Sequence, residues 1–215
     1  MNIREVFFLP NLLSLSRILI APAIVYFLSH SETWAGWLAC AMLGVAGITD
    51  GLDGYLARRS KRITRLGVAL DPIADKIFAV VLVFALILYR DFPLWMVALV
   101  VIRDLLIAGG GIYLLRRLPD LVLPSNLTGK WAFAALVVLL GAHIIRFDFS
   151  INLMTPITAV LLIASLLSYG RVFATVARGD LVKPFEDRVV YRTFRICLAV
   201  IVTLAHMVMF WVEYL

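Results

Sequence analysis

Apolar runs long enough to cross a membrane recur along almost the whole chain. They are about 17 to 24 residues long, and a helix needs about 20 residues to cross the hydrocarbon layer. Lipid offers no hydrogen-bond partners, so each spanning backbone must satisfy its own polar groups, which a helix does. The sequence therefore predicts an all-α, polytopic membrane bundle of about seven spans, at residues 12–29, 34–57, 67–89, 93–115, 130–147, 154–176 and 194–213.

Composition excludes an ordinary soluble domain. Of the 215 residues, 63% are hydrophobic and 16% are charged, whereas a typical soluble domain is about 45–50% apolar and about 25% charged. The net charge of +6 would favour a nucleic-acid partner in a soluble protein, but here the cations gather in alternate loops between spans. We therefore expect membrane lipids, and no nucleic acid, among the partners.

The distribution of cations predicts the orientation of the spans. The loops that follow the second, fourth and sixth spans are basic, whereas the alternate loops hold at most one cation each. Basic loops stay in the cytoplasm, so we expect a multi-pass protein of the cell membrane whose N-terminus is cytoplasmic and whose second and third spans meet at the cytoplasmic face. The cations are Arg58, Arg59, Lys61, Arg62, Arg65, Arg116, Arg117, Lys130, Arg178, Lys183, Arg188 and Arg192.

Four aspartates stand at the edges of the second and third spans, where charge is costly unless it has a function. Asp50 and Asp53 are three residues apart, and Asp71 and Asp75 are four apart, so in helices each pair shares one face. Two such faces turned toward each other form an all-oxygen site. Oxygen ligands suit Mg²⁺ or Mn²⁺, and two divalent ions held by shared carboxylates are a common device for phosphoryl chemistry.

Small and basic residues accompany these acids. Gly54 and Ala57 lie on the same side of the helix as Asp50 and Asp53, so a flat or bulky group can approach the backbone closely there. Arg58 follows, where a guanidinium can bind phosphate oxygens through two parallel hydrogen bonds. Solvated helix caps are an alternative for a single acid, but four acids at two helical spacings are harder to explain in that way.

The whole motif reads D-x-x-D-G-x-x-A-R, then eight residues, then G-x-x-x-D-x-x-x-D, which resembles the signature of the CDP-alcohol phosphotransferases. The resemblance runs from about residue 10 to residue 177 and implies a core of six helices. It divides the chain into an interfacial lead-in at 1–11, a transmembrane core at 12–177, and a charged cytoplasmic linker with an extra transmembrane helix at 178–215. A packing or dimer role is expected of the last part, so a homodimer is one expected assembly.

The resemblance also implies an activity and a role for each matched residue. An enzyme of this kind takes CDP-diacylglycerol and a hydroxyl acceptor, releases CMP and leaves a phosphodiester. By resemblance, two divalent ions, Mg²⁺ or Mn²⁺, are held by the four aspartates, and Asp75 also takes the acceptor proton. Cytidine and pyrophosphate are held by Gly54, Ala57, Arg58 and Gly67.

The acceptor expected first is a small phosphorylated alcohol, glycerol 3-phosphate, whose dianion needs several cations. The candidates for binding its phosphate are Arg103, Lys130 and Arg171. Adjacent residues on one helix do not face each other, so Arg103 and Asp104 are expected to need separate partners; a structural ion pair of Arg103 with another helix is the alternative. The Arg-Asp pair departs from the Arg-Glu of the family's phosphatidylglycerophosphate synthases, which favours a cardiolipin synthase that uses phosphatidylglycerol.

Two other functional classes match the sequence less well. A membrane prenyltransferase also binds pyrophosphate through aspartate-rich helices and Mg²⁺, but its acidic motifs lie in separate halves of a longer chain. A cation carrier would place carboxylates at mid-membrane, often in repeated halves. Here the acids cluster at one face and no half-repeat is visible.

Two features inside the spans have more than one interpretation. Ser14, Ser16 and Arg17 resemble the opening of the family's first helix, but they also fit helix-packing hydroxyls and a cation that snorkels to the interface. The run Gly109-Gly110-Gly111 predicts close packing of the fourth span against a neighbouring helix.

Overall fold

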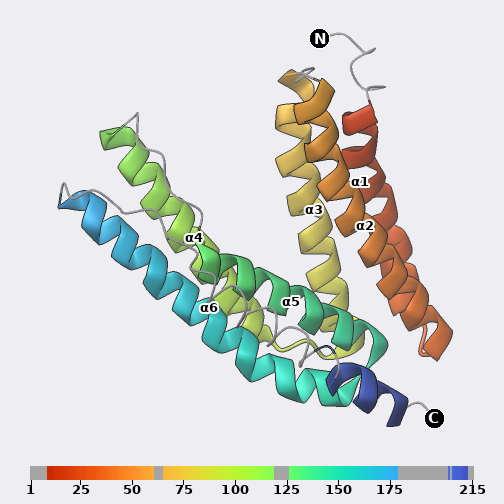
Figure 1. Ribbon diagram of the computed structural model, residues 1–215. Coiled ribbons are helices and arrows are strands. Elements are labelled where there is room, and N and C mark those ends of the chain that lie inside the picture. The colour runs from red at the N-terminus through yellow and green to blue at the C-terminus, as the bar shows by residue number, and fades with distance from the viewer. Residues whose placement is uncertain (1–8, 61–64, 119–125, 179–202, 204, 213–215) are drawn as a thin grey trace. The chain divides into compact units, whose positions relative to one another are not determined.

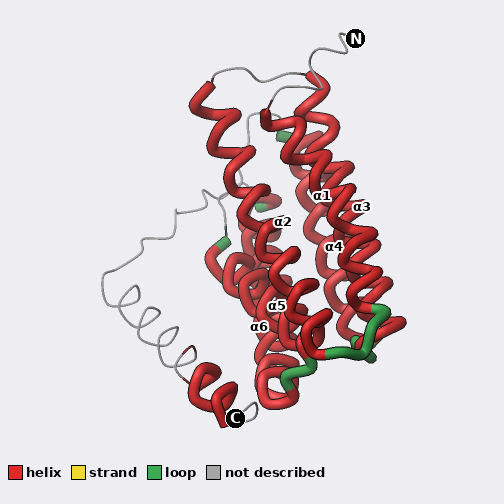
Figure 2. The backbone as a smooth tube through the Cα atoms, turned by 90° about the vertical axis from the view of Figure 1, so that its right-hand side faces the viewer, coloured by secondary structure: helices red, strands yellow, loops and turns green. Residues whose placement is uncertain are grey.

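The computed structural model describes residues 9–60, 65–118, 126–178, 203 and 205–212 (Figure 1). Within this part, the side chains of residues 9–14, 50–60 and 65–72 lie outside the description. The described residues are helical apart from short turns, and Figure 2 shows no strand among them. The helices are α1 (Leu9–Leu28), α2 (Thr33–Ser60), α3 (Arg65–Arg90), α4 (Leu94–Arg117), α5 (Leu127–Ile145) and α6 (Asp148–Ala177), and residues 205–212 are also helical.

The predicted all-α class is confirmed. The first five helices begin and end within three residues of the predicted spans. The sixth begins earlier than predicted, at Asp148, because a carboxylate in the first turn is favourable beside the unpaired N–H groups of a helix start. The seventh predicted span, at 194–213, lies mostly outside the described residues.

Three helices, α4, α5 and α6, are long and apolar enough to span a membrane within the part of the chain that is described. Shorter apolar stretches lie in α1 and α2, at Leu15–Leu28 and Thr33–Thr49. Large apolar side chains are exposed along the outer faces of these helices, as expected where lipid is the solvent. The protein is therefore a polytopic helical membrane protein.

The chain divides into two compact units, each described by itself. Unit 1 consists of residues 1–94 and 143–146. Within it, α1 packs against both α2 and α3. The buried positions of α1 recur every three or four residues, which is one face of a helix: Arg17, Ala21, Ile24 and Leu28. Helix α1 is therefore the centre of unit 1.

The ends of the helices in unit 1 are tied together at the end of α3. Arg90, a buried residue, donates from Nε to the carbonyl of Ile144 at 3.1 Å and from a terminal nitrogen to the carbonyl of His30 at 3.1 Å. Gly36 lies close to the same segment, since a Cβ built on it would be 3.0 Å from the Ile144 carbonyl oxygen. The last turn of α5 therefore belongs structurally to unit 1.

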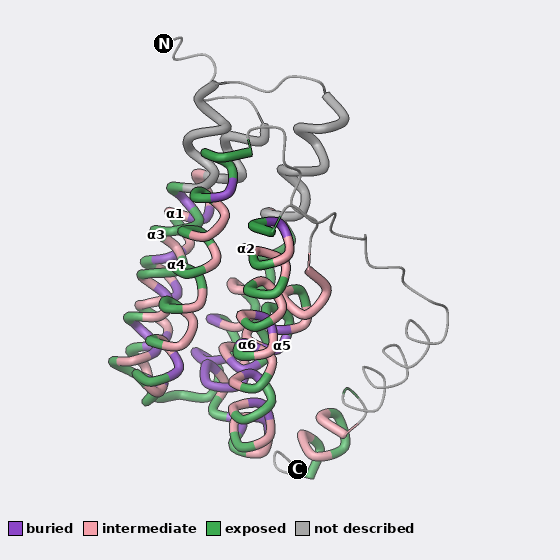
Figure 3. Tube along the Cα trace, turned by 90° about the vertical axis from the view of Figure 1, so that its left-hand side faces the viewer, coloured by how far each residue is buried: buried purple, intermediate pink, exposed green. Residues whose placement is uncertain are grey.

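Unit 2 consists of residues 95–142 and 147–215. Figure 3 shows buried positions recurring along the helices between exposed ones. In α6 the buried stripe includes three hydroxyl residues, Ser150, Thr158 and Ser165. Gly110 of α4 faces α6 so closely that a Cβ there would lie 2.5 Å from the ring of Phe173. The predicted close packing of the glycine run is thus confirmed at Gly110, whereas Gly109 faces open space.

The C-terminal helical residues belong to unit 2. The Nε2 of His206 lies 3.0 Å from the Ser150 hydroxyl at the start of α6. The ring of Phe210 lies edge-on to that of Phe147, with centroids 5.8 Å apart. These contacts attach the C-terminal helical segment to the beginning of α6.

Candidate active site

The aspartates of the motif lie on two consecutive helices of unit 1, as predicted. Asp50 and Asp53 are in α2, and Asp71 and Asp75 are in α3. Asp50 lies ten residues before the end of α2, and Asp75 lies ten residues after the start of α3, or about 15 Å along each helix. The helical spacing on which the prediction depended is therefore present in the backbone.

Only part of the predicted donor site can be followed to its side chains. Those of Asp50, Asp53 and Asp71 lie outside the described residues, so the convergence of the four carboxylates stays a prediction. The same holds for Ala57 and Arg58 in α2. Two matched glycines, Gly54 of α2 and Gly67 of α3, have helical backbones.

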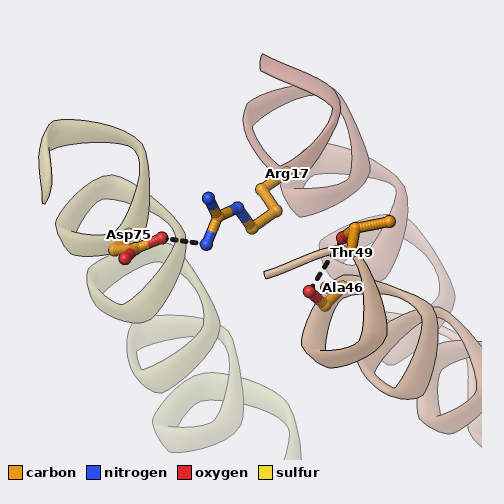
Figure 4. A network of polar contacts seen from close by, with 4 residues as sticks. All are labelled: Arg17, Ala46, Thr49 and Asp75. Atoms are coloured by element: carbon orange, nitrogen blue, oxygen red, sulfur yellow. Dashed lines mark hydrogen bonds and ion pairs between the residues drawn. The ribbon is translucent and has the colours of Figure 1, made fainter. Parts of the chain in front are cut away.

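Asp75 is described, and it meets a cation from another helix. Its Oδ1 accepts a hydrogen bond from a terminal nitrogen of Arg17, which reaches across from α1 (Figure 4). The side chain of Arg17 is 4% exposed, whereas that of Asp75 is 49% exposed. A buried guanidinium needs an anionic partner, so Arg17 is a counter-ion of the predicted general base. The snorkelling interpretation of Arg17 is wrong.

Helix α2 contributes a hydroxyl that is satisfied within its own helix. Thr49, which immediately precedes Asp50, donates from Oγ1 to the carbonyl of Ala46 at 2.8 Å (Figure 4). A threonine that bonds back to its own helix offers no free donor to a neighbour. Of the side chains drawn there, Arg17 and Asp75 are therefore the ones that join separate helices.

Arg103 of α4 has two polar contacts in the described part of unit 2. One terminal nitrogen lies 2.6 Å from Asp104 Oδ1, and the other donates to Ser165 Oγ of α6 at 2.7 Å. The prediction that Arg103 and Asp104 need separate partners is wrong, because the long arginine side chain curves across the roughly 100° that separates adjacent residues of a helix. Arg103 does reach another helix, but it meets a hydroxyl there.

The other two predicted phosphate ligands are exposed. Lys130 lies in the first turns of α5, and Arg171 lies in the last third of α6. The start of α5 is capped by Asn126, whose Oδ1 accepts from the backbone N–H of Thr128 at 3.0 Å and from its hydroxyl at 2.8 Å. The cap fixes the start of α5, and with it the position of Lys130 in the first turn.

The structure brings the start of α5 to Arg103. A Cβ built on Gly129, the residue before Lys130, would lie 3.3 Å from a terminal nitrogen of Arg103. Sequence reasoning missed this contact and the role of Ser165. The signal available was the stripe of Ser150, Thr158 and Ser165, spaced at near-multiples of the helical repeat in an otherwise apolar span.

Comparison with known proteins decides the family. A model of the CDP-alcohol phosphatidyltransferase family matches residues 7–177, a range that holds the aspartate motif, Arg17 and Arg103. The chain belongs to this family. The six described helices α1 to α6 lie within or end at the limits of the matched range.

The share of the sequence that aligns with this chain differs from one CDP-alcohol phosphatidyltransferase to another. The chain is 34% identical over 166 residues to a CDP-diacylglycerol–glycerol-3-phosphate 3-phosphatidyltransferase from Aquifex aeolicus, which covers 74% of the chain and 87% of the relative. An enzyme of the same name from Cereibacter sphaeroides is 37% identical over 105 residues, or 47% of the chain and 48% of the relative. A probable cardiolipin synthase (CMP-forming) from Drosophila melanogaster is 38% identical over 104 residues, or 48% and 31%. The chain thus spans half or less of the latter two relatives.

Proposed function

We propose that the protein transfers a phosphatidyl group from CDP-diacylglycerol to the hydroxyl of glycerol 3-phosphate and releases CMP. The observation that carries the proposal is the complete aspartate signature on α2 and α3, inside a family match at residues 7–177. The Aquifex relative, named for this reaction and aligned over 87% of its length, supports glycerol 3-phosphate as the acceptor.

The aspartate motif is proposed to bind the donor. The motif offers carboxylate oxygens and neither thiol nor imidazole, which fits hard divalent cations. When bound, two Mg²⁺ or Mn²⁺ ions would neutralise the charge of the pyrophosphate and of the departing CMP. Asp50, Asp53, Asp71 and Asp75 would hold these ions. Arg58 would bind phosphate oxygens, and the positions lacking bulky side chains would admit the cytidine: Gly54, Ala57 and Gly67.

Asp75 is proposed as the general base. Its carboxylate would accept the proton of the acceptor hydroxyl as that oxygen attacks the lipid-side phosphorus of CDP-diacylglycerol. One new P–O bond forms to the acceptor, and the P–O bond to CMP breaks, so a single displacement balances the reaction. The hydrogen bond from Arg17 would hold the Asp75 carboxylate in a fixed orientation while it accepts the proton.

The cations outside the aspartate motif are proposed to bind the phosphate of the acceptor. Arg103, Lys130 and Arg171 supply up to three positive charges, which suits the dianion of glycerol 3-phosphate. A second candidate is cardiolipin synthesis from phosphatidylglycerol. Two observations favour it. Asp104 follows Arg103 where phosphatidylglycerophosphate synthases resembling this chain have Glu, and the Drosophila relative is named a probable cardiolipin synthase.

We infer that the protein resides in the cytoplasmic membrane, with the aspartate end of α2 and α3 at the cytoplasmic face. The cations at Arg58, Arg59, Lys61, Arg62 and Arg65 support this orientation, because basic loops remain on the cytoplasmic side. Nucleotide-activated substrates would then reach the site from the compartment that makes them.

The test measures CMP release by the purified full chain from labelled CDP-diacylglycerol. Separate reactions contain Mg²⁺ or Mn²⁺ with glycerol 3-phosphate, phosphatidylglycerol, inositol phosphate, serine or no acceptor, and a chelator reaction tests the metal. We expect metal-dependent CMP release with glycerol 3-phosphate and phosphatidylglycerophosphate as the lipid product. Release only with phosphatidylglycerol would favour the cardiolipin alternative, and no acceptor-dependent release would refute both.

A further inference from the structure

The guanidinium of Arg103 is held on two sides in different ways. The contact with Asp104 is accessible to solvent, because the side chain of Asp104 is 58% exposed. The contact with Ser165 is buried, because Ser165 is 0% exposed on the buried face of α6. The Arg103 side chain itself is 18% exposed, and its Nε is buried without a hydrogen-bond acceptor in the described part of the chain.

Three helices of unit 2 meet at this guanidinium. A Cβ built on Gly129 of α5 would lie 3.3 Å from an Arg103 terminal nitrogen, 3.3 Å from the ring of Tyr169 and 3.5 Å from Ser165 Oγ. The first two distances are tighter than ordinary contacts and the third is an ordinary one, so the absence of a side chain at Gly129 leaves the room that the guanidinium uses. Ser165, Gly129 and Tyr169, which we call the Arg103 seat, therefore lie together beside one end of the guanidinium.

The chemistry of the seat leaves the charge of Arg103 available. A guanidinium carries five N–H donors, and Ser165 uses one of them without supplying a negative charge. A carboxylate at residue 165 would have neutralised the cation, whereas a hydroxyl orients it. The exposed Asp104 is an anion at the opposite terminal nitrogen, and it is the contact that an incoming phosphate can replace.

We propose that Ser165 is a positioning residue that orients Arg103 toward the phosphate of the acceptor, in the space left by Gly129. Ser165 acts through Arg103 and does not itself touch the acceptor. The inference rests on the proposed function, because that function assigns the acceptor phosphate to Arg103. It adds that acceptor affinity depends on a buried hydroxyl of α6.

The experiment compares Ser165→Ala with Ser150→Ala in the full chain. Ser150 is a matched control because it is also a buried serine of α6, with a hydroxyl that meets His206 at 3.0 Å and not Arg103. The KM values for glycerol 3-phosphate and for CDP-diacylglycerol are measured separately. We expect Ser165→Ala to raise the first about tenfold, as for one lost hydrogen bond to a charged group, and to leave the second within about twofold.

A double mutant separates positioning from general damage. Adding Ser165→Ala to Arg103→Ala should change the glycerol 3-phosphate KM little further, because the group that Ser165 orients is already gone. Gly129→Ala should reproduce the effect of Ser165→Ala by moving the guanidinium. Equal changes of both KM values in Ser165→Ala, or a full additional effect in the double mutant, would overturn the inference.

Direct binding distinguishes a failure of this inference from a failure of the proposed function. Calorimetry with glycerol 3-phosphate needs no turnover. If the wild-type chain releases no CMP but binds glycerol 3-phosphate with an affinity that Ser165→Ala weakens about tenfold, the proposed function fails and the seat stands. If the wild type binds the acceptor and Ser165→Ala binds it equally well, the seat is refuted, whatever the enzyme does.

Discussion

At the scale of single residues, the contact between Arg17 and Asp75 changes what is expected of the proposed base. The sequence alone predicts that Asp75→Asn stops catalysis and leaves folding intact, because asparagine is a polar isostere. In the structure the same change removes an anion that contacts a buried guanidinium. Removal of one partner destabilises a buried ion pair, and the half-exposed position of Asp75 reduces that cost.

We therefore expect two separate effects of Asp75→Asn. CMP release should fall by about 100-fold or more, the scale of general-base catalysis, and the thermal midpoint in detergent should fall by about 2 to 4 °C for each kcal/mol lost. Lys76→Gln, at the exposed neighbouring residue, is the control and should change neither. CMP release near the wild-type level would remove Asp75 from the role of base.

Residue patterns predicted the site only where the relevant spacing is local. Asp50 with Asp53, and Asp71 with Asp75, could be assigned to shared faces because helical geometry relates residues three or four apart. Arg17 meets Asp75 across 58 positions, and Arg103 meets Ser165 across 62. Periodicity shows which face of a helix is polar, but it does not show which other helix that face meets.

At the scale of helices, the close approach between the start of α2 and the end of α5 gives a stability prediction. Gly36→Ala places a Cβ 3.0 Å from a backbone carbonyl oxygen, at Ile144, which cannot rotate away as a side chain can. Overpacking of this kind costs about 1–3 kcal/mol, so the thermal midpoint should fall by several degrees.

Gly44→Ala is the matched control on the same helix. Nothing lies within 4 Å of a Cβ built on Gly44, and alanine favours helix over glycine by up to about 1 kcal/mol. Its midpoint should stay the same or rise. Equal destabilisation by Gly36→Ala and Gly44→Ala would contradict the close packing of α2 against residue 144.

The C-terminal helical residues give a second prediction at this scale. His206 and Phe210 contact the beginning of α6, so His206→Ala combined with Phe210→Ala should lower the thermal midpoint. Met207→Ala, at an exposed position of the same segment, should not. If the double variant melts like the wild type, the contacts with Ser150 and Phe147 contribute nothing to stability.

Helix positions were more predictable than helix contacts. Apolar runs predicted the first five helices to within three residues, because the length of a span is set by membrane thickness. The start of α6 at Asp148 was missed because its first turns are too polar to register as a span. Small residues such as Gly110 predicted close packing, but the partner, Phe173, could only come from the structure.

At the scale of the whole molecule, the distribution of cations gives a testable topology. A chain whose Cys40 and Cys197 are replaced by alanine can carry one new cysteine, at Ser31 between α1 and α2 or at Ser60 at the end of α2. In intact cells, a membrane-impermeant maleimide should label Ser31→Cys at once, and Ser60→Cys only after lysis. The reverse pattern would place the aspartate end of α2 and α3 outside the cytoplasm.

The all-α membrane class and the family were predictable at this scale. The apolar composition predicted the class, and the aspartate motif predicted the family. The arrangement of the helices was not, since many bundles are compatible with the same apolar runs. The extra transmembrane helix at 178–215 and the homodimer remain predictions.

The buried ion pair between α1 and α3 also affects how the protein is made. Ribosomes add about 5–20 residues per second, so Arg17 emerges roughly 3 to 12 seconds before Asp75, the residue that will balance it 58 positions later. During this interval the first helix carries a charge that lipid accommodates poorly. We therefore expect stable insertion of α1 to depend on the synthesis of α3, which couples the biogenesis of the first span to that of the third.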